Sequence, residues 1–312
     1  METSTVQGLG QTLHTNSHIT VLEVGPRDGL QNEERVLSPD DRIALIERCA
    51  AAGARRIEAV SFVHPGRVPQ MAGAEEVMKG VPRGAGVSYS GLVLNRRGLD
   101  RALAAGVDEV NVVVVASDTF CRRNQGCTTD EALAAWDVIA AAAHDAGVPA
   151  GMTIAAAFGC PFEGETPPER VAEIARRAEA AGAFEVALAD TIGVGVPAQV
   201  RDLARRTRAA ASSAALRFHF HNTRNTGYAN ALTAVEEGAA VLDASAGGFG
   251  GCPFAPAATG NIATEDLLYA LERSGVGTGM DMAAIAETGT WLGTLLGKPA
   301  PALLGRAGPF PS

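Results

Sequence analysis

Short apolar runs alternate with Ala-rich stretches along most of this chain, and this alternation limits its fold more than any other feature. Several runs are apolar throughout, as in Val112–Ala116, which is typical of parallel strands covered on both faces. The stretches between them predict helices that begin near residues 38, 72, 96, 129, 167, 197, 225 and 264. The runs themselves predict strands at residues 19–24, 56–61, 86–94, 109–116, 150–157, 185–189, 216–220 and 241–245.

Eight strand–helix units over about 255 residues match the size of a (β/α)8 TIM barrel. The rival α/β architecture, a doubly wound sheet, is disfavoured because no Gly-x-Gly-x-x-Gly follows the first run. We therefore expect a TIM-barrel catalytic domain at residues 18–275, preceded by a disordered N-terminal arm at residues 1–17. Residues 276–312 are expected to form a short C-terminal helical extension and tail.

Two of the expected helix starts carry capping signals. Ser38-Pro39-Asp40-Asp41 and Thr166-Pro167-Pro168-Glu169 each place a hydroxyl before proline and acids in the first turn. We expect both hydroxyl groups to cap their helices.

Composition excludes several kinds of partner. The chain has 312 residues, of which 46% are hydrophobic, and a formal net charge of −9. Such a charge repels nucleic acid and anionic membranes, and no apolar run reaches the roughly 18–20 residues of a membrane helix. The N-terminus lacks a signal-peptide pattern, and an odd number of cysteines without a Cys-x-x-Cys pair favours a reduced, cytoplasmic protein.

Polar residues gather where the predicted strands end, which in a TIM barrel is the functional face. His219 and His221 are two residues apart on a strand, so both side chains point to the same face. Asp28 follows the first strand and Asn261 follows the eighth, so they become neighbours when the barrel closes. Two nitrogen and two oxygen donors suit Mg²⁺ or Mn²⁺, with Co²⁺ or Zn²⁺ possible; the alternative is that the histidines only form hydrogen bonds at the barrel top.

Arg27 and Cys252 each have a structural and a catalytic interpretation. Arg27 is either an ion-paired structural residue or a fixed cation for a developing enolate oxygen. A single cysteine is most often a small buried hydrophobe, but four of the five residues before Cys252 are glycine. We expect that stretch to be mobile and poorly packed, which suits a lid. Cys160, which precedes a proline, is expected to be structural.

At these residues the chain resembles the 3-hydroxy-3-methylglutaryl-CoA lyase family, within the metal-dependent TIM-barrel lyases and synthases. The resemblance covers residues from about 19 to 270, nearly the whole predicted barrel. The matching segments are GPRDGLQNE (25–33), IEAVSFVHPGRVPQM (57–71), CPFEG (160–164), ADTIGVG (189–195), HFHNT (219–223) and GGFGGCPFAPAATGNIATEDLLY (247–269).

The resemblance implies a divalent metal held by Asp28, His219, His221 and Asn261. It also implies a retro-Claisen cleavage of 3-hydroxy-3-methylglutaryl-CoA, or of a related branched 3-hydroxyacyl-CoA, to acetyl-CoA and a ketoacid (acetoacetate). Arg27 would stabilise the enolate, and the acid/base or positioning groups would be Glu58, Asp190, His219 and Cys252. Relatives of this family also suggest a homodimer, through the helix expected near Met282–Gly297.

Three positions depart from the family pattern. Glu34 stands where the family commonly has lysine, His64-Pro65-Gly66 replaces Ser-Pro-Lys, and Asn222 follows the second histidine in place of aspartate. The first two lie where coenzyme A is expected, and we expect nearby arginines to compensate: Arg35, Arg67, Arg122 and Arg123. These departures leave the acyl group open.

Three other functions are compatible with parts of this pattern. They are an acyl-CoA condensing synthase, a pyruvate-type aldolase and a non-enzymatic binding barrel. The motif GGCPFA and the absence of a long C-terminal regulatory region count against the synthase. A binding module has no need for a chelating His-x-His beside an aspartate, an arginine and a Gly-rich cysteine loop.

Overall fold

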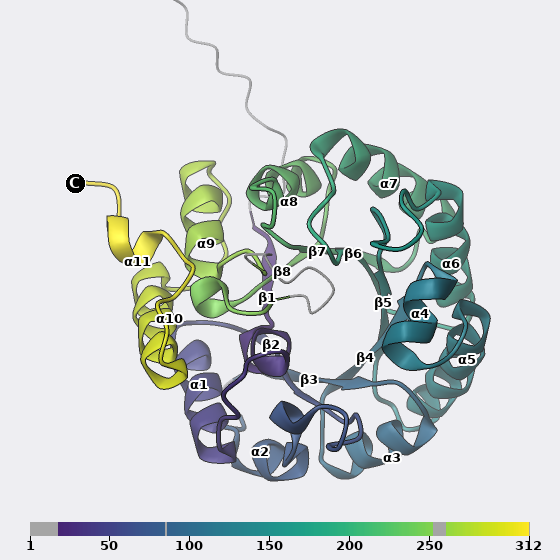
Figure 1. The fold of residues 1–312 in the computed structure, drawn as a ribbon, viewed down its shortest axis with the longest axis horizontal. Coiled ribbons are helices and arrows are strands. Elements are labelled where there is room, and N and C mark those ends of the chain that lie inside the picture. The colour runs from purple at the N-terminus through teal and green to yellow at the C-terminus, as the bar shows by residue number, and fades with distance from the viewer. Residues whose placement is uncertain (1–17, 85, 252–259, 312) are drawn as a thin grey trace, which may run out of the picture.

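The computed structural model describes residues 18–84, 86–251 and 260–311, and its eight parallel strands form one closed barrel in sequence order. Strand β1 pairs with β8 and closes the barrel, and the helices form a ring outside it (Figure 1). The TIM barrel predicted from the sequence is confirmed. The strands are β1 (Thr20–Glu23), β2 (Arg56–Ser61), β3 (Ser88–Val93), β4 (Glu109–Val115), β5 (Ala150–Ala155), β6 (Glu185–Asp190), β7 (Ala215–Phe220) and β8 (Val241–Ala244).

Each of the eight predicted helix starts lies within two residues of an observed one; the short helix at Leu304–Ala307 and a helix after β4 were not predicted. This helix, α4, follows β4; Ser117 caps its start, and Gly126 ends it in a left-handed conformation. The helices are α1 (Pro39–Ala51), α2 (Ala74–Gly80), α3 (Arg96–Ala104), α4 (Asp118–Gln125), α5 (Thr129–Asp145), α6 (Pro168–Ala180), α7 (Pro197–Ala210), α8 (Gly227–Glu236), α9 (Thr264–Arg273), α10 (Met282–Leu296) and α11 (Leu304–Ala307). The arm predicted at residues 1–17 lies outside the described residues.

One predicted cap is confirmed and the other is wrong. Ser38 accepts from the backbone N–H of Asp41, and the Asp41 carboxylate accepts in return, which makes a capping box. The hydroxyl of Thr166 instead donates to the carbonyl of Ala156, at 2.7 Å. Thr166 therefore ties the loop before α6 to the end of β5, and a proline precedes the helix without a side-chain cap.

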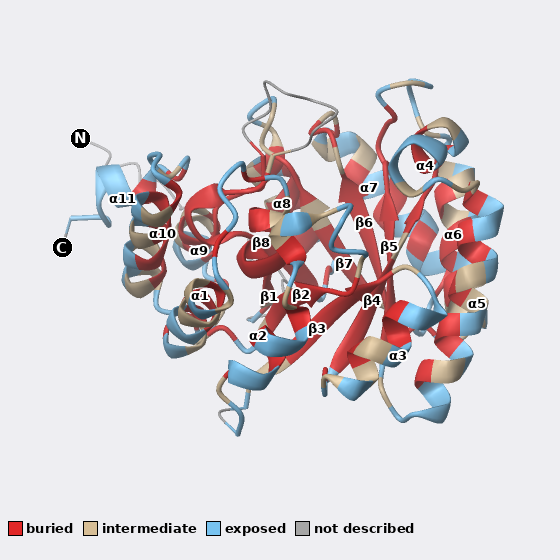
Figure 2. Cartoon of the chain, turned by 60° about the horizontal axis from the view of Figure 1, so that its bottom comes forward, coloured by how far each residue is buried: buried red, intermediate tan, exposed pale blue. Residues whose placement is uncertain are grey.

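The apolar core lies between the strands and the helix ring; Figure 2 shows most of the strands, and parts of the surrounding helices, coloured as buried. The inside of the barrel is different, because it contains a connected set of charged and polar side chains that we call the interior polar network. At its floor, Arg56 binds Glu109 and Glu185, and Arg217 binds Glu185 at 2.6 Å. The network comprises Arg27, Asp28, Arg56, Glu58, Glu109, Asn111, Thr153, Glu185, Arg217, His219, Asp243 and Asn261.

The C-terminal helices pack on the outside of the barrel, with α10 beside α1 and α9 (Figure 1). Leu292 is fully buried within this chain, and the guanidinium of Arg48 lies over the ring of Trp291 at 4.5 Å. Trp291 and Leu292, two large apolar side chains of the helix expected at the dimer interface, therefore have partners within the protomer. The homodimer stays a prediction that light scattering at micromolar concentration tests. No helix among the described residues is long and apolar enough to cross a membrane.

Candidate metal centre and active site

A short π-helical turn, η1 (Gly25–Gly29), directly follows β1 and carries Arg27 and Asp28 into the barrel mouth. The backbone N–H of Gly25 donates to Glu23, at 2.8 Å, which fixes the start of the turn. A Cβ atom at Gly25 would lie 2.7 Å from that same Glu23 oxygen, so a larger residue would displace the carboxylate that fixes the turn. The glycine in this motif therefore serves the placement of the two functional side chains that follow it.

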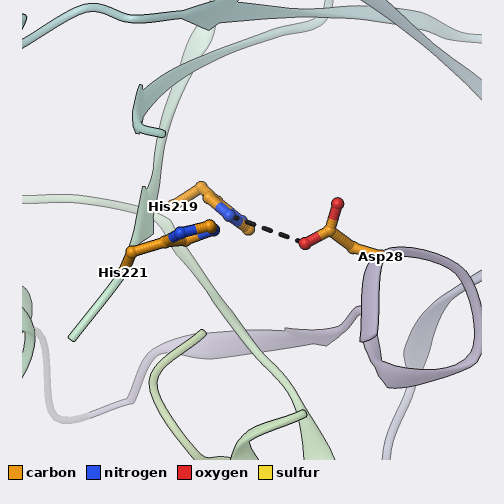
Figure 3. Close-up of side chains that lie close together, drawn as sticks. All are labelled: Asp28, His219 and His221. Carbon is orange, nitrogen blue, oxygen red and sulfur yellow. Dashed lines mark ion pairs between the residues drawn. The ribbon is translucent and has the colours of Figure 1, made fainter. Parts of the chain in front are cut away.

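Asp28, His219 and His221 form the candidate metal centre. Each offers a ligand atom, and the three atoms lie within 4.8 Å of one another. Figure 3 shows the two imidazole rings side by side at the end of β7, opposite the Asp28 carboxylate. The Nε2 atom of His219 is 3.8 Å from Asp28 Oδ2, and the ring centroids of the histidines are 5.1 Å apart. The two histidines thus share one face of the strand, as their spacing predicted.

Asn261 completes this group. It pairs with His221 through an isolated β-bridge, and its Nδ2 donates to Asp28 Oδ2 at 2.9 Å. Its side-chain oxygen is buried and has no hydrogen-bond partner within the described ranges; the same holds for His221 Nδ1. A buried acceptor without a donor is costly, and a cation is one way to satisfy it. The four predicted ligands therefore come together as a donor set that fits a divalent metal.

The protonation of Asp28 and of His221 suits a cation, whereas Asp243 and Asp28 outweigh burial and raise the pKa of His219, which must lose a proton to bind metal. Burial, together with the charge of His219, lowers the pKa of His221 to about 3, so this imidazole is neutral at neutral pH. Burial alone would raise the pKa of Asp28, but Arg27 and the two histidines outweigh it and hold that pKa below its usual value. Neutral imidazole and ionised carboxylate are the forms that bind metal.

The net charge of the interior polar network also favours a bound cation. With His219 counted as neutral, five carboxyl groups stand against three guanidinium groups, which leaves a formal excess of two negative charges. A divalent cation held by Asp28 would supply the matching positive charge.

Arg27 is both ion-paired and directed at the centre, so its two interpretations are compatible. Its Nε donates to Glu58 at 2.6 Å, and its Nη1 donates to Asp28 at 2.7 Å. Glu58 in turn accepts from Asn111 at 3.0 Å. These contacts fix the guanidinium beside the candidate metal centre, with Glu58 as the main partner of Arg27.

Asp190 closes the turn that follows β6. One of its oxygens accepts from the backbone N–H of Val194, at 2.8 Å, and the other accepts from Gly195, at 2.9 Å. Burial raises the pKa of Asp190 above its usual value. A carboxylate oxygen can accept a second hydrogen bond, so these contacts orient Asp190 and still leave it able to exchange a proton.

The Gly-rich stretch was expected to be poorly packed, and in its described part this is wrong. Phe249 is buried, and Asn32 donates to the carbonyl of Gly251 at 2.8 Å. Gly250 has a φ of 114°, and a Cβ atom there would lie 2.4 Å from Asn261 Nδ2. Close packing against Asn261, a candidate metal ligand, therefore explains why residue 250 is glycine. Cys252 lies outside the described residues, so its predicted role is untested by this geometry.

Cys160 is buried, and its sulfur lies 2.9 Å from the hydroxyl of Ser117. This contact ties the loop after β5 to the start of α4, in keeping with the structural role expected for it.

The sequence did not single out Arg217 or Asp243. Asp243 Oδ2 lies 3.2 Å from His219 Nδ1, and Arg217 Nε lies 3.3 Å from Asp243 Oδ1. The sequence could have pointed to both residues, because each is a charged residue in a mostly apolar strand. A charged side chain in a strand buried on both faces needs a partner.

The four arginines expected at coenzyme A are all exposed and lie on segments that follow strands at the barrel mouth. The guanidinium of Arg123 stacks on the ring of Phe162, at 4.0 Å. Arg35, Arg67 and Arg122 form no ion pair within the part of the chain that the structure describes. Free guanidinium groups at this rim are suited to phosphate.

We predict that the double change Arg122→Ala, Arg123→Ala raises KM for a CoA thioester more than it lowers kcat. The contacts that it removes would bind the ground state and the transition state equally well. The control is Arg205→Ala, Arg206→Ala, which removes the same charge from α7, where both arginines are ion-paired. Steady-state kinetics tests this. A collapse of kcat with unchanged KM would assign these arginines another role.

The fold and this cluster together define a class, a TIM-barrel enzyme with a candidate metal site. Within that class the chain belongs to the HMGL-like family, whose model matches residues 18–291.

Three named relatives make the likeness more specific. (R)-citramalyl-CoA lyase of Chloroflexus aurantiacus is 46% identical, over 93% of this chain and 95% of its own. Hydroxymethylglutaryl-CoA lyase of Pseudomonas mevalonii is 44% identical, over 89% of this chain and 93% of its own. An HMG-CoA lyase from Acinetobacter baumannii, solved with coenzyme A and 3-methylmalate, superposes with a TM-score of 0.90 at 38% identity, over 94% and 96% of the two chains. These relatives are named as CoA-thioester lyases and match about nine-tenths of the chain. The chain is therefore a carbon–carbon lyase.

Proposed function

We propose that this protein cleaves 3-hydroxy-3-methylglutaryl-CoA, in a metal-dependent retro-Claisen reaction, to acetyl-CoA and acetoacetate. The observation that carries the proposal is the meeting of three ligand atoms, from Asp28, His219 and His221, beside an arginine that is hydrogen-bonded to Asp28. The names of the relatives support a CoA thioester as substrate.

A bound divalent cation would be held by Asp28, His219, His221 and Asn261 and would act as a Lewis acid that lowers the pKa of the substrate hydroxyl. The chain's own groups then have defined tasks. Asp190, with its raised pKa, takes the hydroxyl proton, and a histidine of the centre is the alternative base. As the C2–C3 bond breaks, Arg27 stabilises the negative charge that develops on the thioester oxygen. Cys252 then protonates the enolate carbon.

Citramalyl-CoA is the second candidate substrate, favoured by the 46% identity to a lyase named for it. It has one methylene less between the carbinol carbon and the carboxylate, so its ketoacid product is pyruvate. A pocket distinguishes substrates that differ by one methylene only by about 10- to 200-fold. Both esters are therefore expected to react, at different rates.

The test compares both enantiomers of each ester, with Mg²⁺ and with Mn²⁺, and measures acetyl-CoA together with the ketoacid. Acetoacetate at the higher kcat/KM supports the proposal, whereas pyruvate at the higher kcat/KM assigns the enzyme to citramalyl-CoA. If neither ester yields acetyl-CoA, both assignments are wrong.

A further inference from the structure

Asp243 lies beside a candidate ligand without belonging to the ligand set. It is the partner of His219 in the register of β7 and β8, so both side chains enter the barrel interior at one level. Its Oδ2 is 3.2 Å from Nδ1 of His219. A carboxylate only accepts hydrogen bonds, so the ring nitrogen must be the donor. Nδ1 therefore keeps its hydrogen, and Nε2 is the nitrogen that faces Asp28, 3.8 Å away.

Asp243 is itself held in place by Arg217. The guanidinium Nε is 3.3 Å from Asp243 Oδ1, while its other nitrogens donate to Glu185 at 2.6 Å and to Thr153 at 2.7 Å. The side chains of Arg217 and Asp243 are 4% and 5% exposed, so water does not compete for these contacts. Glu185 and Thr153 fix the guanidinium by hydrogen bonds, and its charge holds the Asp243 carboxylate through an ion pair in which Nε and Oδ1 form no hydrogen bond with each other.

The same arginine is also connected to Arg27, across the barrel. Thr153 donates to Asn111 at 3.0 Å, and Asn111 donates to Glu58 at 3.0 Å. Glu58 binds Arg27, which binds Asp28. One ring of contacts therefore orients both sides of the metal centre.

We propose that Asp243, held by Arg217, is a positioning residue that sets the tautomer and the orientation of His219 for divalent-metal binding. This rests on the metal centre of the proposed function. The structural alternative is that Asp243 only neutralises Arg217. The two interpretations differ in metal affinity, since loss of a carboxylate behind a ligating histidine typically weakens binding by about 10- to 100-fold.

The test is Mn²⁺ binding to metal-stripped full-length protein, followed by the electron paramagnetic resonance of free Mn²⁺. Asp243→Asn is nearly isosteric and is expected to raise the Kd by about 10- to 100-fold. The matched control is Glu109→Gln, which removes one charge from the same network at Arg56 but touches neither Arg217, Asp243 nor His219. It is expected to change the Kd by less than about threefold. If the two changes raise the Kd equally, Asp243 acts only as a charge partner of Arg217 and the positioning role is wrong.

A second measurement does not depend on either variant folding. In wild-type protein saturated with Mg²⁺, nuclear magnetic resonance is expected to show a ring N–H proton on Nδ1 of His219, assigned by its loss in His219→Gln. A proton on Nε2 instead overturns the inference. A wild type that binds no Mn²⁺ at all overturns the proposed metal centre as well, whereas a wild type that binds as tightly as Asp243→Asn overturns only the positioning role.

Discussion

Chelation will abolish turnover of the CoA thioester, and Mg²⁺ or Mn²⁺ will restore it. His221→Ala will weaken metal binding by about 10- to 100-fold or more and remove most of the activity, because it deletes one of two imidazole donors. Burial keeps the pKa of His221 at about 3, so wild-type binding at neutral pH meets no competition from a proton on this ring. Metal content and calorimetric titration of purified protein measure the effect.

The matched control for His221 is His144→Ala, at the exposed end of α5, far from the barrel mouth. It should leave metal content and kcat unchanged. Full activity in excess chelator, or normal metal binding by the His221 variant, would remove this centre from the reaction.

Cys252→Ser will lower kcat by about 10²- to 10⁴-fold while metal affinity stays the same. The enolate that remains after bond cleavage needs a proton at carbon, and a thiol with an ordinary pKa of about 8.5 is well matched to that task near neutral pH. A serine hydroxyl is nearly isosteric but far too weak an acid. Alkylation of the thiol should inactivate the wild type, and bound substrate should protect it.

Cys160→Ser is the control for Cys252. It makes the same atomic change at a buried cysteine whose sulfur contacts Ser117, so it should leave kcat nearly intact. If Cys252→Ser also keeps a near-normal kcat, another group is the proton donor, with water or a histidine as the remaining candidates.

The sequence by itself determined the barrel and most of the proposed centre. Eight runs rich in apolar residues predicted parallel strands buried on both faces, and all eight are strands of the barrel. The spacing of His219 and His221 placed both rings on one face, because side chains alternate along a strand. The sequence also predicted that Asp28 and Asn261 lie close together, because barrel closure makes the ends of the first and eighth strands neighbours.

Only the tertiary structure decided which polar side chains contact one another inside the barrel. The partners of Arg217 come from three other strands, β5, β6 and β8, and strand register together with the barrel's curvature sets these distances. No local pattern encodes them, so a lone aspartate in β8 gave no sign that it would lie 3.2 Å from a candidate ligand histidine. The Gly-rich stretch was misjudged for the same reason: glycine permits mobility, but a close neighbour such as Asn261 also requires glycine, and only packing distinguishes the two.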